Sequence, residues 1–374
     1  MATPATPPFR ADHVGSLLRP PALREARDAF ERGALPRAEL TRIEDAAIRD
    51  VVKLQEEVGL EAATDGEFRR KEWHMDFLKR FANVRAVPSQ IKLRFHTHEG
   101  ETEVMPPSLV VEGKLGRPEP IFVDHFKFLQ GTTRVTAKQT LPSPTILHFR
   151  GGRRAVDKTA YPEMDSFFAD LARVYREEIA DLAAAGCRYL QIDETNFAYL
   201  CDPVFREQVR TTIGEDPDRL PHTYAKLLND AIAGRPKDMV VAMHLCRGNN
   251  QSAWLAEGGY EPVAETLFNE VAVDGYFLEY DSPRAGDFAP LRFVPKGKRV
   301  VLGLVTTKLP ELERKDALKR RIDEAARHVP LEQLALSPQC GFSSTIEGNK
   351  VTVADEIAKL RLVVEVAREV WGEG

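Results

Sequence analysis

The sequence has few cysteines, no long apolar run and no excess of positive charge, and each absence excludes a class of protein. Four cysteines among 374 residues cannot form the dense disulfide framework of small secreted domains. No apolar run reaches the roughly 18 residues that a membrane-spanning helix needs. A formal net charge of −5 provides no basic field for nucleic acid or an anionic membrane. We therefore expect a cytoplasmic protein with reduced thiols and neither a nucleic-acid nor a membrane partner.

The amino terminus is compositionally biased, whereas the remainder of the chain shows neither an internal repeat nor a linker. Residues 1–9 are dominated by Pro, Thr and Ala and lack the charged and apolar regions of a secretory signal. We expect a disordered tail over residues 1–9 and a single domain over residues 10–374. That length exceeds the usual domain size, but a (β/α)8 barrel with insertions commonly reaches it.

Short apolar runs typical of strands alternate with amphipathic stretches typical of helices. The strand candidates are residues 10–16, 61–67, 134–140, 189–193, 239–244, 275–280, 299–306 and 333–337. Eight strands joined by helical crossovers favour an α/β fold of the closed (β/α)8, or TIM-barrel, type over an open sheet. Residues 91–98 and 104–112 depart from this alternation and predict a β-hairpin insertion within residues 88–120.

Four side chains that bind metals follow strand candidates in the last third of the chain: His244, Cys246, Glu279 and Cys340. In an extended segment, side chains two residues apart point to one side, so His244 and Cys246 can reach the same ion. A parallel barrel brings the carboxyl ends of its strands to one rim, where active sites form. Imidazole, two thiolates and a carboxylate are a tetrahedral zinc set. For His-x-Cys taken alone, a buried histidine beside a core cysteine is the competing interpretation.

Further polar groups follow other strand candidates. Asp65 and Glu67 follow the second, Asp193 and Glu194 the fourth, and Ser16 ends a Gly-Ser turn after the first. Carboxylates at this rim suit an ammonium group or acid–base chemistry, and a hydroxyl with turn amides suits a substrate carboxylate. Each acid is equally consistent with a helix amino-terminal cap.

Taken together and in this order, the motifs resemble the catalytic barrel of cobalamin-independent methionine synthase. The resemblance is carried by Arg-Ala-Asp-His-Val-Gly-Ser (10–16), Asp-Gly-Glu-Phe-Arg (65–69), Leu-Gln-Ile-Asp-Glu (190–194), His-Leu-Cys (244–246) and Ser-Pro-Gln-Cys-Gly (337–341). It extends from about residue 10 to the carboxyl terminus, and its most specific part is the His-x-Cys, Glu and Cys set. Full-length enzymes of that family carry two related barrels, and this chain is similar to the zinc-bearing carboxyl-terminal one.

The resemblance implies that the four ligands bind Zn2+ and that Ser16, Glu67 and Asp193 hold the amino-acid part of homocysteine. It implies a methyltransferase that makes methionine from homocysteine or acts on a similar small thiol, with the zinc-bound thiolate as nucleophile, since zinc coordination deprotonates a thiol. The methyl donor would be methyltetrahydrofolate or methylcobalamin. Methylcobalamin could be presented by a partner corrinoid protein.

Two residues depart from the family pattern at the donor side. Phe149 stands where the family usually has a tryptophan that stacks on the pterin. Lys308 stands where the family has a histidine thought to assist protonation of the leaving folate nitrogen. Lys308 could still donate a proton if desolvation lowers its pKa, whereas methylcobalamin would need no such acid.

Three other functions compete with this one. An alkyltransferase that activates coenzyme M and attacks an epoxide would share the zinc ligands but would replace the ammonium-binding acids with groups for a sulfonate, so Glu67 and Asp193 favour an amino-acid thiol. A metal-dependent hydrolase would use His96 and His98 with an aspartate after the last strand, where Cys340 stands instead. A non-catalytic zinc-binding protein is the third alternative, because structural zinc sites are closed four-ligand sites.

Overall fold

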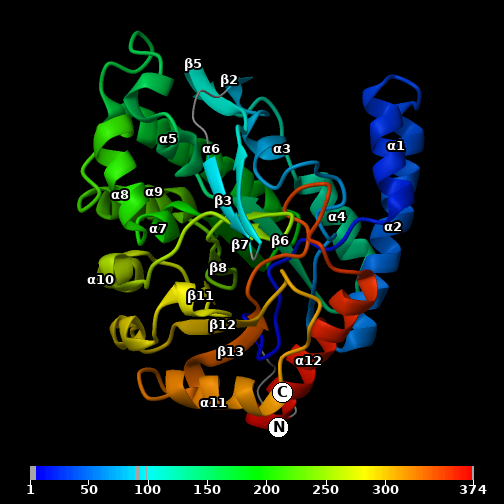
Figure 1. Cartoon of the computed structure of the whole chain (residues 1–374). Helices are drawn as coiled ribbons and strands as arrows, with labels where there is room; N and C mark the ends of the chain where they lie inside the picture. Colours follow the sequence, from blue (N-terminus) through cyan, green and yellow to red (C-terminus); the bar gives the residue numbers. More distant parts are fainter. Residues whose placement is uncertain (1–5, 89–92, 98, 373–374) are drawn as a thin grey trace.

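The computed structural model describes residues 6–88, 93–97 and 99–372, and its centre is a curled sheet of parallel strands (Figure 1). Seven strands hydrogen-bond in the order β1-β6-β7-β8-β11-β12-β13. Their bounds are Ala62–Ala63, Thr136–Pro142, Tyr189–Glu194, Val240–Leu245, Gly275–Glu279, Arg299–Val305 and Leu334–Pro338. The carboxyl ends of all seven strands therefore lie at one rim.

The segment that follows Phe9 closes the sheet into a barrel. Ala11 forms a parallel bridge with Leu336 of β13, and the Asp12 amide donates to the Leu336 carbonyl at 3.0 Å. On the other side, the Thr64 hydroxyl after β1 donates to the Gly15 carbonyl at 2.6 Å. Residues 10–16 thus occupy the place of the eighth strand, although only a bridge forms there, because the chain turns at Gly15 with φ 131°. This arrangement agrees with the predicted (β/α)8 barrel.

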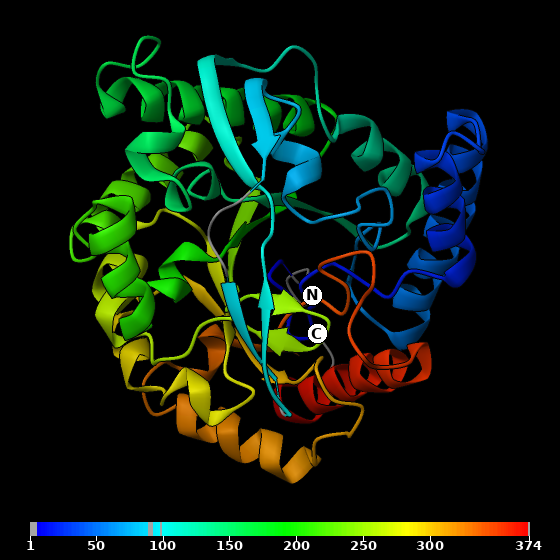
Figure 2. The same ribbon diagram turned by 45° about the horizontal axis from the view of Figure 1, so that its top comes forward.

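An outer layer of helices surrounds the barrel (Figure 2). The longer helices are α1 (Pro21–Glu31), α2 (Arg37–Val58), α4 (Val123–Thr132), α6 (Met164–Ala184), α9 (Leu220–Ile232), α10 (Glu261–Glu270), α11 (Lys315–Ala325) and α12 (Val353–Trp371). Local sequence defines several of their ends: α2 stops at Gly59 in the left-handed conformation, and α12 starts with a capping box between Thr352 and Asp355. Within the described residues, no helix combines the length and apolar character needed to span a bilayer.

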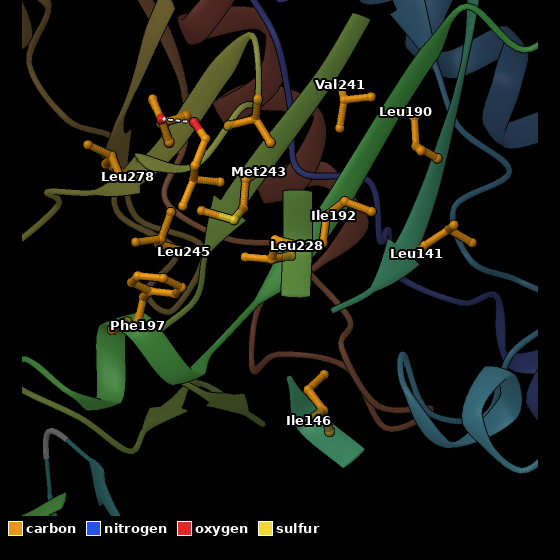
Figure 3. Close-up of a cluster of buried hydrophobic side chains, with 14 of the residues drawn as sticks. Leu141, Ile146, Leu190, Ile192, Phe197, Leu228, Val241, Met243, Leu245 and Leu278 are labelled. Atoms are coloured by element: carbon orange, nitrogen blue, oxygen red, sulfur yellow. Dashed lines mark hydrogen bonds between the residues drawn. The ribbon is translucent and has the colours of Figure 1, made fainter. Parts of the chain in front are cut away.

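Side chains alternate between the two faces of each strand, and this alternation places the functional groups. Leu190 and Ile192 of β7 and Val241 and Met243 of β8 lie in one hydrophobic cluster with Leu228 of α9 (Figure 3). The intervening residues belong to the barrel interior, which contains Phe9, Val14, Ala62, Tyr189, Ala242, Phe277, Val301 and Ala335. With a period of two, Asp193, His244 and Glu279 continue these inward rows at the carboxyl ends of β7, β8 and β11.

The predicted disordered tail, residues 1–9, extends too far toward the carboxyl terminus. Residues 1–5 lie outside the described part of the chain. Phe9 is only 3% exposed, and its ring lies 6.2 Å from that of Tyr189 in the barrel interior. The chain therefore joins the core before residue 10, because Phe9 fills the amino-terminal end of the barrel.

The predicted insertion is present, and it contains four strands rather than a single hairpin. They are β2 (Ala82–Val87), β3 (Leu93–Thr97), β4 (Gly100–Val104) and β5 (Ser108–Gly116). β3 pairs with β4 and β5 pairs with β2, whereas the sequence pattern paired residues 91–98 with residues 104–112. Pro106 and Pro107 lack the amide hydrogen that a ladder needs and separate β4 from β5. Residues 91, 92 and 98 of the predicted hairpin lie outside the described residues.

The hairpin β3–β4 also joins the loop that follows β8. His96 of β3 pairs with Trp254 of β10 (Ala253–Trp254), and β10 pairs with β9 (Asn249–Asn250). The resulting sheet has the order β4-β3-β10-β9. The hairpin crosses in front of the barrel in Figure 2.

Candidate active site

Four potential metal ligands meet at the carboxyl-terminal rim of the barrel. His244 lies in β8, Cys246 follows it, Glu279 ends β11, and Cys340 comes two residues after β13. All four are buried, and their ligand atoms lie within 4.8 Å of one another. The two Sγ atoms are 3.5 Å apart, close to the roughly 3.8 Å that two sulfurs take on a tetrahedral zinc with Zn–S bonds of about 2.3 Å. Across the described residues, this is the only group of three or more such ligands.

The chemistry of these side chains fits a bound cation. Both ring nitrogens of His244 are buried without a hydrogen-bond partner among the described residues, an arrangement that costs free energy unless something binds them. The hydrogen bond from Cys246 lowers the pKa of Cys340 well below its usual range, and the nearby His244 ring and Lys308 ammonium act in the same direction. Metals bind the thiolate form of cysteine, so the direction of this shift favours a bound cation.

A cavity of about 410 Å3 opens beside the ligands and also contains the residues predicted to bind the substrate. His244, Cys246 and Cys340 line it, together with Ser16, Glu67 and Asp193, the last of which is the register partner of His244. Cavities of this size hold small organic ligands.

Glu279 does not line this cavity and is held from the protein side. Its Oε1 accepts from the Arg247 amide at 2.9 Å, and its Oε2 lies 3.4 Å from Nη2 of Arg284. Its backbone amide donates to the hydroxyl of Tyr260 at 3.0 Å. These partners orient the carboxylate toward the other ligands, as the supporting groups around metal sites do.

Two buried acids, Glu67 and Asp193, line the cavity. Burial raises the pKa of both, that of Asp193 to about 7; the Glu67 carboxylate also raises the pKa of Asp193, and Asp65 also raises that of Glu67. The Thr140 hydroxyl donates to Oε1 of Glu67 at 3.0 Å, and Nη1 of Arg70 lies 3.2 Å from the same oxygen. Oε2 of Glu67 is buried, and no described residue forms a hydrogen bond with it. An ammonium group would satisfy that oxygen and favour the ionised form of both acids.

The loop that carries Cys340 approaches Ser16 closely. A Cβ at position 341 would lie 1.9 Å from Oγ of Ser16, so only glycine fits there. The Phe342 amide donates to the Ser16 carbonyl at 2.9 Å. The Ser16 hydroxyl is thereby held next to the metal ligands.

Neither residue predicted on the donor side lines this cavity. Lys308 is 2% exposed, and its Nζ donates to Oδ1 of Asn249 at 2.9 Å and lies 3.5 Å from the Ala253 carbonyl. Phe149 lines a neighbouring cavity of about 300 Å3, where its ring lies 5.9 Å from that of Tyr199. Their predicted roles stay predictions.

The remaining candidates lie apart from the ligands. His96 stacks on Trp254, with ring centroids 6.1 Å apart, in the sheet formed by the insertion, and His98 lies outside the described residues. Cys187 and Cys201 are core residues, as predicted, and burial raises the pKa of each to about 12.

Trp73, His74 and Arg150 are among the cavity-lining residues that sequence reasoning missed. Trp73 and His74 come six and seven residues after Glu67, in the loop before the short helix α3 (Met75–Leu78). Arg150 directly follows α5 (Ile146–Phe149). In the sequence, the only indication was a Trp-His pair shortly after the Asp-Gly-Glu motif (65–67). No periodic pattern there shows which way these side chains point.

Comparison with known proteins points to one family. Residues 9–369 match the family model described as "Cobalamin-independent synthase, Catalytic domain". The uncharacterized protein YxjH of Bacillus subtilis is 46% identical over 366 residues, which cover 97% of this chain and 95% of that protein. The crystal structure of a putative vitamin-B12 independent methionine synthase from Listeria monocytogenes is 38% identical with a TM-score of 0.77, and the match covers 98% of this chain and 99% of that one.

More distant relatives include enzymes with named activities. The 5-methyltetrahydropteroyltriglutamate–homocysteine methyltransferase of a Synechococcus strain is 24% identical over 341 residues, which are 90% of this chain but 41% of that enzyme. A B12-independent methionine synthase from a Shewanella species, solved with selenomethionine, shares the fold with a TM-score of 0.70 at 20% identity, and the match covers 96% of this chain and 97% of that one.

Proposed function

The chain belongs to the cobalamin-independent methionine synthase family, and from that premise we propose that it is a zinc-dependent methyltransferase that converts homocysteine to methionine. Membership of this family gives the reaction class, methyl transfer. One observation carries the rest: His244, Cys246 and Cys340 line a cavity that two buried acids also line, and Glu279 meets these three ligands from behind the wall.

The sulfur end of the substrate would lie against the metal ligands. A zinc ion held by the four residues would supply one function, which is to favour the thiolate form of the substrate sulfur at neutral pH. His244, Cys246 and Cys340 line the cavity, so they would present the ion to the substrate, while Glu279 would hold it from the protein side. Two thiolates and a carboxylate leave little net positive charge, which keeps the incoming sulfur nucleophilic.

The amino-acid end would lie against Ser16, Glu67 and Asp193. The unpartnered Oε2 of Glu67 and the raised pKa of Asp193 suit an ammonium group. A sulfonate in the same place would face two buried acids and be repelled. This contrast favours homocysteine over a coenzyme M-type thiol.

The methyl donor would enter the same cavity, and methyltetrahydrofolate and methylcobalamin are the two candidates. Lys308 lies behind Asn249, which lines the cavity and accepts its hydrogen bond. We therefore expect Lys308 to act through its positive charge, which favours the thiolate form of Cys340, rather than as a proton donor to the leaving group. Phe149 would reach a donor only if the donor extends into the neighbouring cavity.

The test of thiol activation is X-ray absorption at the zinc edge, with homocysteine added to the zinc-loaded protein. We expect one additional sulfur neighbour of zinc, and its absence would refute the proposal. Homocysteine methylation is assayed in parallel with methyltetrahydrofolate, as the mono- and triglutamate, and with methylcobalamin.

A matched pair of variants tests the ligand set. Cys340→Ser should lose most of its zinc, measured by mass spectrometry of the metal content, and with it the turnover. Cys187→Ser removes a buried thiol that lies outside the ligand set and should keep both. Full zinc occupancy in Cys340→Ser would exclude this site.

A further inference from the structure

We propose that Arg19 is a positioning residue, which fixes the acid Glu67 relative to the metal ligand Cys340 and so makes the cavity select a thiol that also carries an ammonium group. The role of Glu67 toward an ammonium group rests on the proposed function, whereas the bridge that Arg19 forms rests on its own hydrogen bonds. Arg19 does not line the cavity, so it acts through the residues that it holds.

Arg19 joins two loops at the rim of the barrel. It is 5% exposed, in the segment that precedes α1. Its Nη2 donates to the carbonyls of Glu67 and Arg70, each at 3.0 Å. Its Nη1 shares its hydrogens among the Ser343 carbonyl at 2.8 Å, the Ser343 hydroxyl at 2.6 Å and the Thr345 carbonyl at 3.1 Å. One guanidinium therefore holds the loop after β1 against the loop that follows β13.

The loop after β1 holds Glu67 in a strained conformation. Glu67 has φ 61°, in the left-handed region that residues with a side chain seldom adopt. Such a conformation persists only where the surrounding structure fixes it, and it often marks a ligand site. The Glu67 amide donates to Oδ1 of Asp65 at 2.9 Å, and the Glu67 carbonyl accepts from Arg19. These bonds fix the peptide groups on both sides of Glu67 and with them the direction of its carboxylate.

The other loop carries the ligand Cys340, and Arg19 holds its next turn. Ser343 is buried three residues after Cys340, and its hydroxyl and carbonyl both accept from Arg19. The Trp73 amide donates to the Ser344 carbonyl at 3.2 Å, so the two loops also meet farther from the ligand. Backbone contacts thus bring the loops together, whereas the rigid, planar fork of Arg19 sets their spacing at the level of Glu67.

The charge of Arg19 supports the same role. Burial raises the pKa of Glu67, and the guanidinium groups of Arg70 and Arg19 oppose this shift. Burial lowers the pKa of Arg19 to about 10, so its guanidinium stays charged at neutral pH. A fixed positive charge behind Glu67 favours the ionised carboxylate, and an ammonium group binds that form.

A thiol substrate with an ammonium group must contact both loops at once. Glu67 and Cys340 line the same cavity, and a substrate of fixed length reaches both only while their separation is kept. A site that is already ordered spares the bound ligand the cost of ordering it. Without the bonds from Arg19, Glu67 could leave its strained conformation, and the contact with the ammonium group would be lost while the sulfur contact remains.

Calorimetric titration of the zinc-loaded protein with two thiols tests the assignment. L-homocysteine carries the ammonium group, and 4-mercaptobutanoate is the same molecule without it. The wild type should bind homocysteine more tightly. Arg19→Lys keeps the charge but cannot hold both loops with a single ammonium group. It should weaken the binding of homocysteine about 10-fold and leave the affinity for 4-mercaptobutanoate and the zinc content unchanged.

Arg27→Lys is the matched control. Arg27 is 6% exposed, and its Nη2 donates to the Phe68 carbonyl at 2.8 Å, one residue beyond Glu67. Among the described residues, none of its hydrogen bonds reaches the loop that carries Cys340. Arg27→Lys therefore disturbs a buried guanidinium at the same motif without breaking the bridge, and it should leave both affinities unchanged.

Ser343→Ala is a second, milder variant, which serves if circular dichroism shows that Arg19→Lys does not fold. It removes one acceptor of Arg19 and should weaken the binding of homocysteine several-fold, again without affecting 4-mercaptobutanoate. The proposal is overturned if the variants weaken both thiols equally or neither. A wild type that binds the two thiols equally well would refute both the ammonium site of the proposed function and this inference. A preference for homocysteine that survives in Arg19→Lys would overturn only the role of Arg19.

Discussion

At the level of single residues, several of the buried polar atoms that have no partner among the described residues gather at one cavity. The ring nitrogens of His244, Oε2 of Glu67 and Nδ1 of His74 are all of this kind, and all three residues line one cavity. Each unsatisfied atom costs free energy in the free protein, and a ligand that satisfies it recovers that cost. These atoms support the proposal that a polar substrate binds in this cavity.

Glu356 is a buried acid of another kind, because its burial makes the stability of the fold depend on pH. It is 1% exposed in the first turn of α12, and its Oε2 accepts from the Leu18 amide at 2.9 Å. Burial raises its pKa to about 8. The folded state thus keeps a proton that the unfolded chain releases above its ordinary pKa, so the contribution of Glu356 to stability falls as the pH rises from about 4.5 to about 8.

Glu356→Gln removes this titration. Relative to wild type, the free energy of unfolding of the variant should increase between pH 5 and pH 8.5, by up to about 4 kcal/mol. Urea unfolding at several pH values measures it. Glu365→Gln on the same helix, where the carboxylate is 53% exposed and paired with Lys315, should show no such trend. A difference between Glu356→Gln and wild type that does not change with pH would contradict the assignment.

At the level of elements, the insertion forms part of the cavity wall. Leu93 and Phe95 of β3 line the cavity with their buried side, while Arg94 between them is exposed. Because β3 also pairs with β10, the hairpin is tied to the loop that follows β8, the strand that contains His244. The insertion and the rim of the barrel therefore form the wall of the cavity together.

Phe95→Ala should open this wall. Loss of a buried phenyl contact of about 1.5–3 kcal/mol should raise the KM for the methyl donor roughly 10-fold or more, with the zinc content unchanged. Arg94→Ala, on the opposite face of the same strand, should leave the KM unchanged. Steady-state kinetics with both substrates measures the effect, and equal behaviour of the two variants would show that β3 does not contact the donor.

At the level of the whole molecule, one buried network ties the closing segment to the barrel. Oδ1 of Asp12 accepts from Nζ of Lys138 in β6 at 3.0 Å, and Oδ2 accepts from the hydroxyl of Tyr189 in β7 at 2.8 Å. The side chains of Asp12 and Lys138 are both fully buried. The network crosses the barrel interior. Among the described pairings, residues 10–16, which close the barrel, form no β ladder with β1, so these side-chain bonds hold the segment in place.

Lys138→Met leaves the Asp12 charge buried without its cation. We expect the free energy of global unfolding to fall by about 3–5 kcal/mol. Lys226→Met breaks an exposed pair with Asp230 on α9 and should change it by less than about 0.5 kcal/mol. Guanidinium denaturation of both variants provides the comparison. Equal, small effects would mean that the network does not stabilise the closed barrel.

The sequence by itself determined the barrel and indicated the four potential metal ligands that meet at its rim. Strand-like runs repeat along the chain, side chains alternate with period two, and parallel strands share one rim, so the positions of His244, Cys246, Glu279 and Cys340 follow from local pattern. Only the tertiary structure decided the pairing of β2 with β5, the burial of Phe9, and the meeting of Trp73, His74 and Arg150 at the cavity. Those contacts join loops that are distant in sequence and have no periodicity, and the direction of a loop side chain depends on what packs around it.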